Sequence, residues 1–241
     1  MKKAKKVKII AGLFYLFLVL SFLYFFLSKF TLTELTSYEF IKNNREYFLD
    51  LRQNNLLFIS LIFLLSTIFW VLMAGFGSPA ALLAGFILGK WLGLIIVLFG
   101  LSIGSTLLYI FGNYFLKDFI REKFLARFRR LEIKFKKSEF LYLLIYRFVG
   151  GIPFALSNVL PCIFNVKVIN FFFATLIGIA PQIFLVVSIG SGLEKIIEQN
   201  LDAPQIKDLL MSPEIYQPFG AFFILVIISL ILRKLFYKKD D

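Results

Sequence analysis

Apolar residues fall into long runs along this chain, with polar segments between them. The runs lie at residues 9–28, 56–90, 92–116, 139–164 and 166–189, with a last one inside 218–241. A membrane-spanning helix needs about 20 mostly apolar residues. Several runs reach that length, and 59% of all residues are apolar, more than a soluble domain needs for its core. The pattern predicts an all-α polytopic membrane protein.

The first run could be a signal peptide or a retained helix. It follows a lysine-rich segment, residues 1–8, and it is longer than the apolar region of a signal peptide. No small-residue cleavage site follows it. We therefore predict that residues 9–28 remain as a transmembrane helix.

Glycine and proline interrupt two of the runs. The first break is the segment from Gly75 to Pro79, and the second runs from Gly150 to Pro153. Proline removes a backbone donor and clashes with the preceding turn, so a continuous helix is not expected at either place. In hydrocarbon, a freed backbone group costs several kcal/mol unless protein or a cavity satisfies it. Each break therefore predicts a re-entrant hairpin and a candidate site.

The distribution of charge predicts the topology. Basic residues gather in 1–8, 117–137 and the end of 218–241, whereas 29–55 is balanced and 193–217 leans acidic. Under the positive-inside rule, both termini and the 117–137 segment lie in the cytoplasm, and 29–55 and 193–217 are outer loops.

Each half between these loops must then cross the membrane an odd number of times. We predict a hairpin at 56–90 that enters and leaves on the outer side, followed by a span at 92–116. A second hairpin at 139–164 enters and leaves on the inner side, followed by a span at 166–189. The two turns would meet near the midplane.

An offset of 74 residues aligns the two halves, pairing Pro79 with Pro153 and Gly104 with Gly178. The alignment and the odd number of crossings predict an inverted repeat with broken helices, an arrangement in which transporters bind substrate between the halves.

The segment 117–137 carries an apolar stripe at helical spacing on a basic background. It predicts an amphipathic helix on the inner leaflet, held by anionic lipid. The alternative is a charged helix that packs its stripe on the protein itself.

The net charge of +12 could indicate nucleic acid, but its cationic residues lie between apolar segments, as topology signals do. We expect anionic lipid headgroups as partners and no nucleic acid, and we leave a homo-oligomer open. The chain has no His and one Cys, which excludes an intrachain disulfide and the commonest metal ligand and general base. We expect no cofactor, no metal and no enzymatic activity.

The breaks hold the candidate site for a lipid phosphate. Ser78 and Pro79 suit the N-cap and first position of a half-helix, and Pro153 could start a second one. Helix N-termini attract anions, and Arg147 adds a cation whose fork matches phosphate oxygens. Arg147 could instead only tie the hairpin by donating to freed carbonyls.

The remaining candidate residues have structural alternatives. Gly150, Gly151 and Asn158 belong to the same candidate phosphate site, although Asn158 could brace the broken backbone instead. Small residues allow close helix packing in membranes. On that ground we assign packing or hairpin roles to Gly75, Gly77, Thr175, Gly178 and Pro181.

The residues also resemble a known family. The second half carries Arg147, Pro153-Phe154, Asn158, Pro161, Asn165-Val166-Lys167, Thr175, Gly178-Ile179-Ala180-Pro181 and Gly190. The first half carries Ser78-Pro79, Ala84-Gly85, Gly89, Gly93, Gly104, Tyr109 and Gly112. Over residues 56–192 this is similar to the VTT-domain family, also called DedA-like or SNARE-associated membrane proteins.

The resemblance implies two re-entrant hairpins that face each other and lipid transport in a bacterial inner membrane. In the family, this transport is phospholipid scrambling or recycling of an undecaprenyl phosphate carrier. Members thought to be proton-coupled carry acidic residues in the first hairpin, but this chain has no Asp or Glu at 56–116 or 140–193. We therefore expect passive movement of lipid.

Three classes of function stay open. The first is a lipid translocase, the second is a carrier or channel for a small anion, and the third is a non-transporting assembly factor. A lipid path needs a groove open to the acyl chains, whereas a solute path needs a polar vestibule. The predicted spans hold few polar residues, which favours the lipid path.

Overall fold

The structure is a computed structural model of the chain. It describes residues 2–29, 43, 45–115, 117, 132–133, 138–149 and 153–198, and the single positions 211, 213, 216, 220 and 223. Every element within these residues is a helix, and no strand occurs among them. The prediction of an all-α chain is therefore confirmed for the described part.

The first half contains helices α1 (Lys2–Lys29), α4 (Arg45–Asn54), α5 (Leu56–Leu72), α6 (Gly77–Leu88) and α7 (Lys90–Phe115). Helix α4 lies inside the polar segment 29–55. Ile59, at the start of α5, packs with Phe86 and Leu88 at the end of α6. Helices α5 and α6 are thus two antiparallel arms joined at the predicted first break.

The second half contains α10 (Glu139–Val149), α11 (Phe154–Val159), the 3-10 helix η1 (Leu160–Ile163), α12 (Val168–Gly178) and α13 (Ala180–Glu198). Leu143 of α10 packs with Cys162 of η1, while Arg147 lies beside Ser157 of α11. These contacts make α10 and the α11–η1 pair a second set of antiparallel arms.

The residues of the predicted span at 166–189 do not form one straight helix. The structure divides it into α12 and α13, whose axes differ by 45°. Pro181 stands in the first turn of α13 and has no N–H to donate to the preceding turn, which explains the bend. Helix α13 then continues to Glu198, into the segment predicted as an outer loop.

Among the described helices, α7 is long and apolar enough to cross a membrane alone. Helices α12 and α13, taken together through Glu194, meet the same criteria as a bent pair. The number of crossings and their orientation stay predictions.

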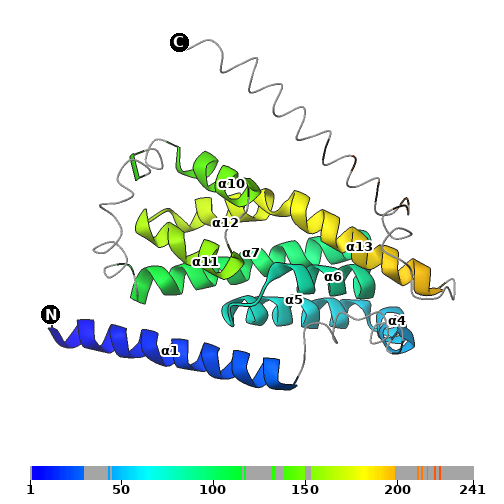
Figure 1. Cartoon of the computed structure of the whole chain (residues 1–241), viewed down its shortest axis with the longest axis horizontal. Helices are drawn as coiled ribbons and strands as arrows, with labels where there is room; N and C mark the ends of the chain where they lie inside the picture. Colours follow the sequence, from blue (N-terminus) through cyan, green and yellow to red (C-terminus); the bar gives the residue numbers. More distant parts are fainter. Residues whose placement is uncertain are drawn as a thin grey trace, which may run out of the picture.

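The two halves share an arrangement of arms. Thr67 and Val71 of α5 lie beside Gly100 and Gly104 of α7, so these two helices run parallel. In the second half, α10 runs parallel to α12. Each first arm therefore lies along the helix that follows its hairpin (Figure 1).

The halves run in opposite directions. Tyr109 of α7 stacks on Phe171 of α12, and Leu101 of α7 packs with Ile183 of α13. Because the order along α7 is the reverse of the order along α12 and α13, these helices are antiparallel. This is the arrangement that an inverted repeat predicts, although the repeat across a bilayer stays a prediction.

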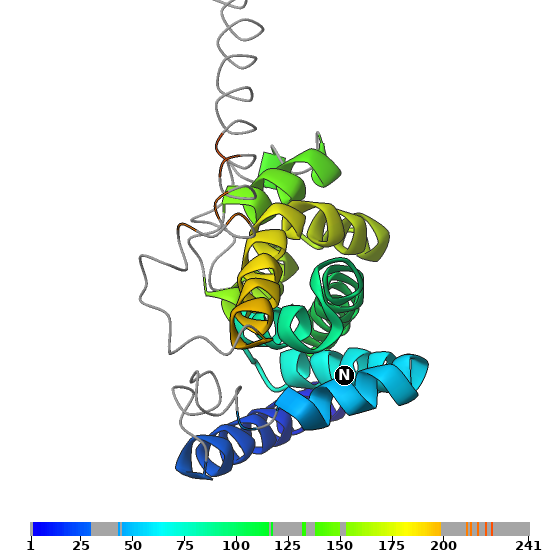
Figure 2. The same ribbon diagram turned by 90° about the vertical axis from the view of Figure 1, so that its right-hand side faces the viewer.

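Glycines let α6 of the first half dock closely on α13 of the second. A Cβ on Gly85 would lie 2.0 Å from the carbonyl oxygen of Val187, and one on Gly190 would lie 2.0 Å from that of Leu82. Neither position has room for a side chain. The two views show α6 and α13 side by side (Figures 1 and 2).

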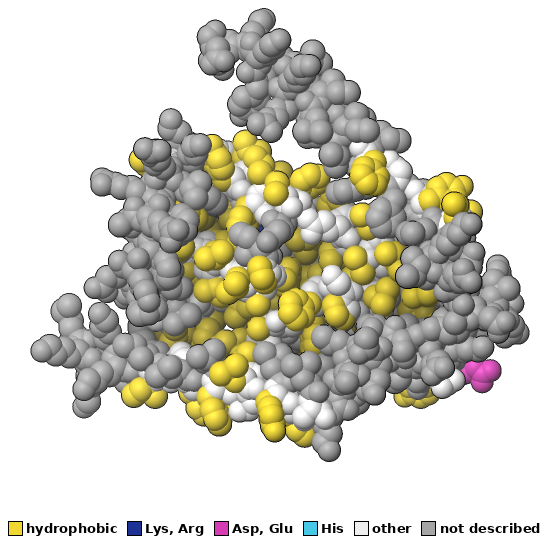
Figure 3. Space-filling view, in the orientation of Figure 1, with side chains coloured by type: hydrophobic (Ala, Val, Ile, Leu, Met, Phe, Trp, Pro, Cys, Tyr) yellow, Lys and Arg dark blue, Asp and Glu magenta, His cyan; other side chains and the backbone are white. Residues whose placement is uncertain are grey.

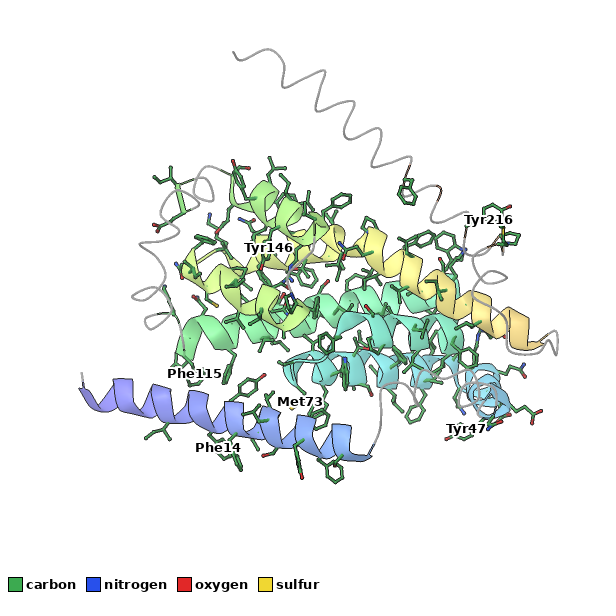
Figure 4. All side chains as sticks on the ribbon, in the orientation of Figure 1. Phe14, Tyr47, Met73, Phe115, Tyr146 and Tyr216 are labelled. Atoms are coloured by element: carbon green, nitrogen blue, oxygen red, sulfur yellow. The ribbon has the colours of Figure 1, made fainter. Side chains whose placement is uncertain are left out.

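Helix α1 lies against the first half. Its Tyr15 hydroxyl donates to the carbonyl oxygen of Leu72, and the Tyr15 ring packs on Phe111 of α7. Phe14 is 61% exposed and points away from the other helices (Figure 4). Hydrophobic side chains also cover much of the described surface on the face in Figure 3, which suits contact with lipid chains.

Several predictions lie outside the described residues. They concern Gly150 and Gly151, the amphipathic helix within 117–137 apart from a few positions, most of the 193–217 loop, and the C-terminal helix and tail at 218–241.

Candidate functional site

A cavity of about 250 Å³ lies between the two helix breaks. The first break contributes Phe76, Gly77 and Ser78, and the second half contributes residues of α10, α11, α13 and the bend before α13. These are Tyr146, Arg147, Phe154, Ser157, Ile179, Gln182, Ile183 and Val186. Residues that flank both breaks thus share one cavity, although the breaks are far apart in sequence.

Arg147 is the cation of this cavity. It stands in the last turn of α10 and is only 4% exposed. Its Nε donates to Thr175 Oγ1 at 3.0 Å, its Nη1 to Ser157 Oγ at 2.7 Å and its Nη2 to Asn158 Oδ1 at 2.8 Å. Helices α11 and α12 therefore hold the guanidinium, which α10 carries, in one position.

Every partner of Arg147 in the described part of the chain is neutral. A guanidinium keeps its charge at neutral pH and has five N–H donors. Three of them are used by Thr175, Ser157 and Asn158, which leaves two for a further acceptor. None of the described residues that line the cavity is an Asp or a Glu. A buried cation without a counter-ion is costly, so an anion that enters the cavity gains from pairing with it.

Aromatic rings surround the guanidinium. Its Cζ lies 4.9 Å from the ring centre of Phe171, 5.8 Å from that of Phe154 and 6.0 Å from that of Tyr146. These distances are within the range of cation–π attraction, which offsets part of the cost of burial. Tyr146 lies on the inner side of α10 (Figure 4), and its hydroxyl donates to the carbonyl oxygen of Ser157 at 3.3 Å.

The N-terminus of α6 also faces the cavity. The prediction that Ser78 is the N-cap and Pro79 the first helical residue is wrong, because α6 begins at Gly77 and its N-cap is Phe76. No side chain caps this helix. A phenyl ring cannot accept the first-turn N–H groups, and those of Gly77 and Ser78 belong to the positive end of the helix dipole.

The two prolines predicted for the phosphate site, Pro79 and Pro153, do not line the cavity. Pro79 follows Ser78 in α6 but does not line the cavity. Pro153 is the N-cap of α11 rather than its first residue, and it is exposed. Helix α11 has only 6 residues, too few for a strong dipole of its own. The anion-attracting end therefore belongs to α6.

Arg147 does tie the two arms of the hairpin, but among the described residues it donates to side chains of α11 and α12 and not to freed carbonyls. The freed carbonyl oxygens of Phe148 and Arg147 accept instead from Nε2 of Gln182 in α13, at 2.8 Å and 3.4 Å. Sequence reasoning missed Gln182. A polar residue in an apolar run, one position after Pro181, was the only signal of it.

Asn158 and Thr175 act through Arg147. Asn158 is fully buried, accepts from the guanidinium and does not line the cavity, so it holds Arg147 rather than facing a ligand. Thr175, predicted as a packing residue, is likewise a hydrogen-bond acceptor for Arg147.

The predicted packing glycines make close contacts. A Cβ on Gly178 would lie 2.6 Å from Arg147 Cβ, so this glycine lets α12 approach α10 at the cation. Gly77 lies against Leu101, and Gly75 lies under the Trp70 ring, where a Cβ would be 2.3 Å from it. The left-handed residue of the first break is neither glycine but Ala74, at φ 60°.

Comparison with known proteins identifies the domain that holds this cavity. Residues 76–192 match the family described as VTT domain. The chain is 34% identical over 118 residues to the uncharacterized protein YqeD of Bacillus subtilis, which covers 47% of this chain and 57% of that protein. It is 25% identical over 134 residues to the transmembrane protein 41 homolog of Caenorhabditis elegans, covering 53% of this chain and 54% of the relative.

The chain thus spans a little more than half of the length of these curated relatives. No solved structure matches it. The matched segment begins at the first break, at Phe76, and includes every residue that lines the cavity. On this match, residues 76–192 of the chain are a VTT domain.

Proposed function

We propose that this protein moves a phosphate-bearing lipid between the two leaflets of a membrane without energy input. The observation that carries the proposal is the buried guanidinium of Arg147, which lines the cavity and has only neutral partners among the described residues. A lipid phosphate that crosses a bilayer must leave water, and a preformed cation lowers that cost.

The first-turn N–H groups of α6 support the same role. They lie at the cavity wall opposite the second half, at Gly77 and Ser78, where the helix dipole favours negative charge. A phosphate between them and Arg147 would be contacted from both halves of the domain. Two halves that share one ligand are the arrangement expected of alternating access.

Passive movement follows from the composition of the membrane region. Residues 56–116 and 140–193 contain no Asp or Glu, and the chain contains no His. A proton relay inside a membrane normally uses such groups. We therefore propose that lipid moves down its own gradient.

The test is a lipid-movement assay with purified protein in vesicles that contain an acyl-labelled fluorescent phospholipid. Dithionite reduces label in the outer leaflet, and albumin extracts label from the outer leaflet only. In vesicles that contain the protein, inner-leaflet lipid should move to the outer leaflet, so that both reagents act on its label as well. We expect Arg147→Ala to slow both by at least about tenfold, since hydrogen bonds to charged groups contribute roughly 1.5–3 kcal/mol.

A matched control removes a different arginine. Arg52 of α4 lies beside Gly89, at the end of α6 remote from the cavity, so Arg52→Ala should leave the rate unchanged. Arg147→Lys separates charge from shape, because lysine keeps the cation but loses the planar fork. We expect an intermediate rate for it.

The albumin reading separates lipid movement from a small-anion path. Dithionite is itself a small anion, so a channel would admit it and bleach the inner leaflet without moving lipid. Dithionite bleaching without albumin extraction would replace the proposal by an anion path. If neither the dithionite signal nor the albumin signal exceeds that of empty vesicles, a non-transporting assembly factor becomes the better interpretation.

A further inference from the structure

We propose that the cavity prefers lipids whose phosphate is the only charged group over lipids in which an ammonium accompanies the phosphate. This inference rests on the proposed function and specifies the headgroup class that the same site accepts. It follows from what surrounds Arg147 and from what the cavity wall lacks.

Among the residues that the structure describes, the cavity wall offers one positive side chain and no negative one. Arg147 is the cation, and the other lining residues are apolar, aromatic or neutral polar. The nearest carboxylate along α10 is that of Glu139, eight residues earlier and thus about 12 Å away along the helix. A bound ammonium would therefore have no anionic partner in the cavity other than its own phosphate.

Glu139 is also occupied. Its Oε1 accepts from the backbone N–H of Lys167 at 2.7 Å, and its Oε2 accepts from Asn170 Nδ2 at 2.5 Å. These bonds cap the start of α12 and hold the carboxylate at the other end of α10. It is not placed to serve a headgroup beside Arg147.

Aromatic rings are the other common site for an ammonium, but here they already face a cation. Tyr146 and Phe154 line the cavity, and both ring centres lie within 6.0 Å of the Arg147 Cζ. Phe76 is the remaining ring of the lining, and it is 53% exposed. One exposed ring does not form the aromatic cage that binds quaternary ammonium groups.

Neutral oxygens do not balance the charge either. Ser157 Oγ accepts from Arg147 and donates to the carbonyl oxygen of Phe154, so it is used. The Gln182 and Ser78 side chains also line the cavity, but they are uncharged, so an ammonium that donates to their oxygens keeps its charge. An ammonium in the cavity would therefore meet the guanidinium as a like charge, which disfavours zwitterionic headgroups.

The experiment compares two lipids with the same labelled acyl chain, phosphatidylglycerol and phosphatidylcholine, each at trace level in identical vesicles. Initial rates are read by albumin extraction. We expect phosphatidylglycerol to move faster by roughly tenfold, equivalent to about 1.4 kcal/mol. Equal rates, or a faster choline lipid, would overturn the preference while leaving lipid movement intact. Failure of both lipids to move would overturn the proposed function itself.

A pair of variants tests whether charge is the cause. Ser78→Asp adds a carboxylate to the cavity wall in the first turn of α6, where an acidic residue suits the helix dipole. Ser78→Asn has nearly the same size without the charge. We expect Ser78→Asp to bring the ratio of the two rates close to one and Ser78→Asn to keep it well above one. If Ser78→Asp leaves the ratio of the phosphatidylglycerol and phosphatidylcholine rates unchanged, charge in the cavity does not determine the headgroup preference.

Discussion

The two helix breaks are satisfied in different ways. At the first, between α5 and α6, neutral donors hold the chain: Gly75 N–H donates to the carbonyl oxygen of Trp70, and Trp70 Nε1 donates to that of Phe76. Tyr15 of α1 adds a third neutral bond. At the second, an amide from α13 reaches the end of α10, and the buried guanidinium of Arg147 joins α10, α11 and α12.

The difference shows that a shared arrangement of arms does not imply shared chemistry. The first half contributes a helix N-terminus and a close-packed wall, through α6. The second half contributes the charge. A backbone break needs only neutral donors, as the first one demonstrates, so the cation at the second is beyond what the break itself requires. That surplus is the reason to assign Arg147 to a ligand.

Two glycines that the offset of 74 aligns give the strongest test of the contrast between the two halves. A Cβ on Gly104 would lie 2.8 Å from Val71 Cβ, and one on Gly178 would lie 2.6 Å from Arg147 Cβ. We expect Gly104→Ala and Gly178→Ala each to lower the free energy of unfolding by about 1–3 kcal/mol, because both overfill a close helix contact. Unfolding in mixed detergent micelles measures this.

Only Gly178→Ala should also slow lipid movement, because it displaces the α10 turn that carries Arg147. The albumin assay should show a several-fold lower rate for it, and an unchanged rate for folded Gly104→Ala protein. If Gly104→Ala slows lipid movement as much, the two halves share the chemistry and the contrast between them is lost.

An effect of similar size or smaller is expected from the hydrogen-bond donors at each break. Gln182→Met keeps the length of the side chain but removes the bonds to the carbonyl oxygens of Phe148 and Arg147, and we expect a loss of roughly 1–3 kcal/mol in unfolding free energy. Trp70→Phe removes a single bond, to the carbonyl oxygen of Phe76, which is 53% exposed. We expect about 1 kcal/mol or less for the lost bond.

The same unfolding titration, run on Gln182→Met and Trp70→Phe, shows which variant loses more unfolding free energy. A larger loss for Trp70→Phe than for Gln182→Met would show that the second break does not depend on α13. It would also remove the argument that Gln182, rather than Arg147, satisfies the end of α10.

Local sequence rules located both breaks but not the residues that hold them. Proline and glycine mark a helix end through their own backbone, so the ends of α5 and α10 could be predicted within a few residues. Gln182 could not, because its partner Phe148 is 34 residues away and no local pattern links them. The left-handed residue was equally hidden, since a helix end favours glycine there but the chain uses Ala74.

The sequence predicted the cation of the candidate site but not the residues that hold it in place. An arginine in an apolar run is conspicuous, and Ser78 followed from its place before a proline. Their meeting in one cavity depended on the antiparallel halves, which the odd number of crossings and the offset of 74 indicated. The partners Ser157 and Thr175 are ordinary small polar residues of apolar helices, so their hydrogen bonds to Arg147 become visible only in three dimensions.

A small effect is also expected at the hydrogen bond between α1 and the first break. Tyr15→Phe keeps the ring contact with Phe111 but removes the hydroxyl that donates to the carbonyl oxygen of Leu72. We expect a loss of about 0.5–1.5 kcal/mol in unfolding free energy, the usual net value of one neutral hydrogen bond. Tyr24→Phe, at a 79% exposed position of the same helix, is the matched control and should change nothing. Neither variant should alter lipid movement. A slower rate for Tyr15→Phe alone would mean that the first break also takes part in transport. The functional contrast between the two halves would then be wrong.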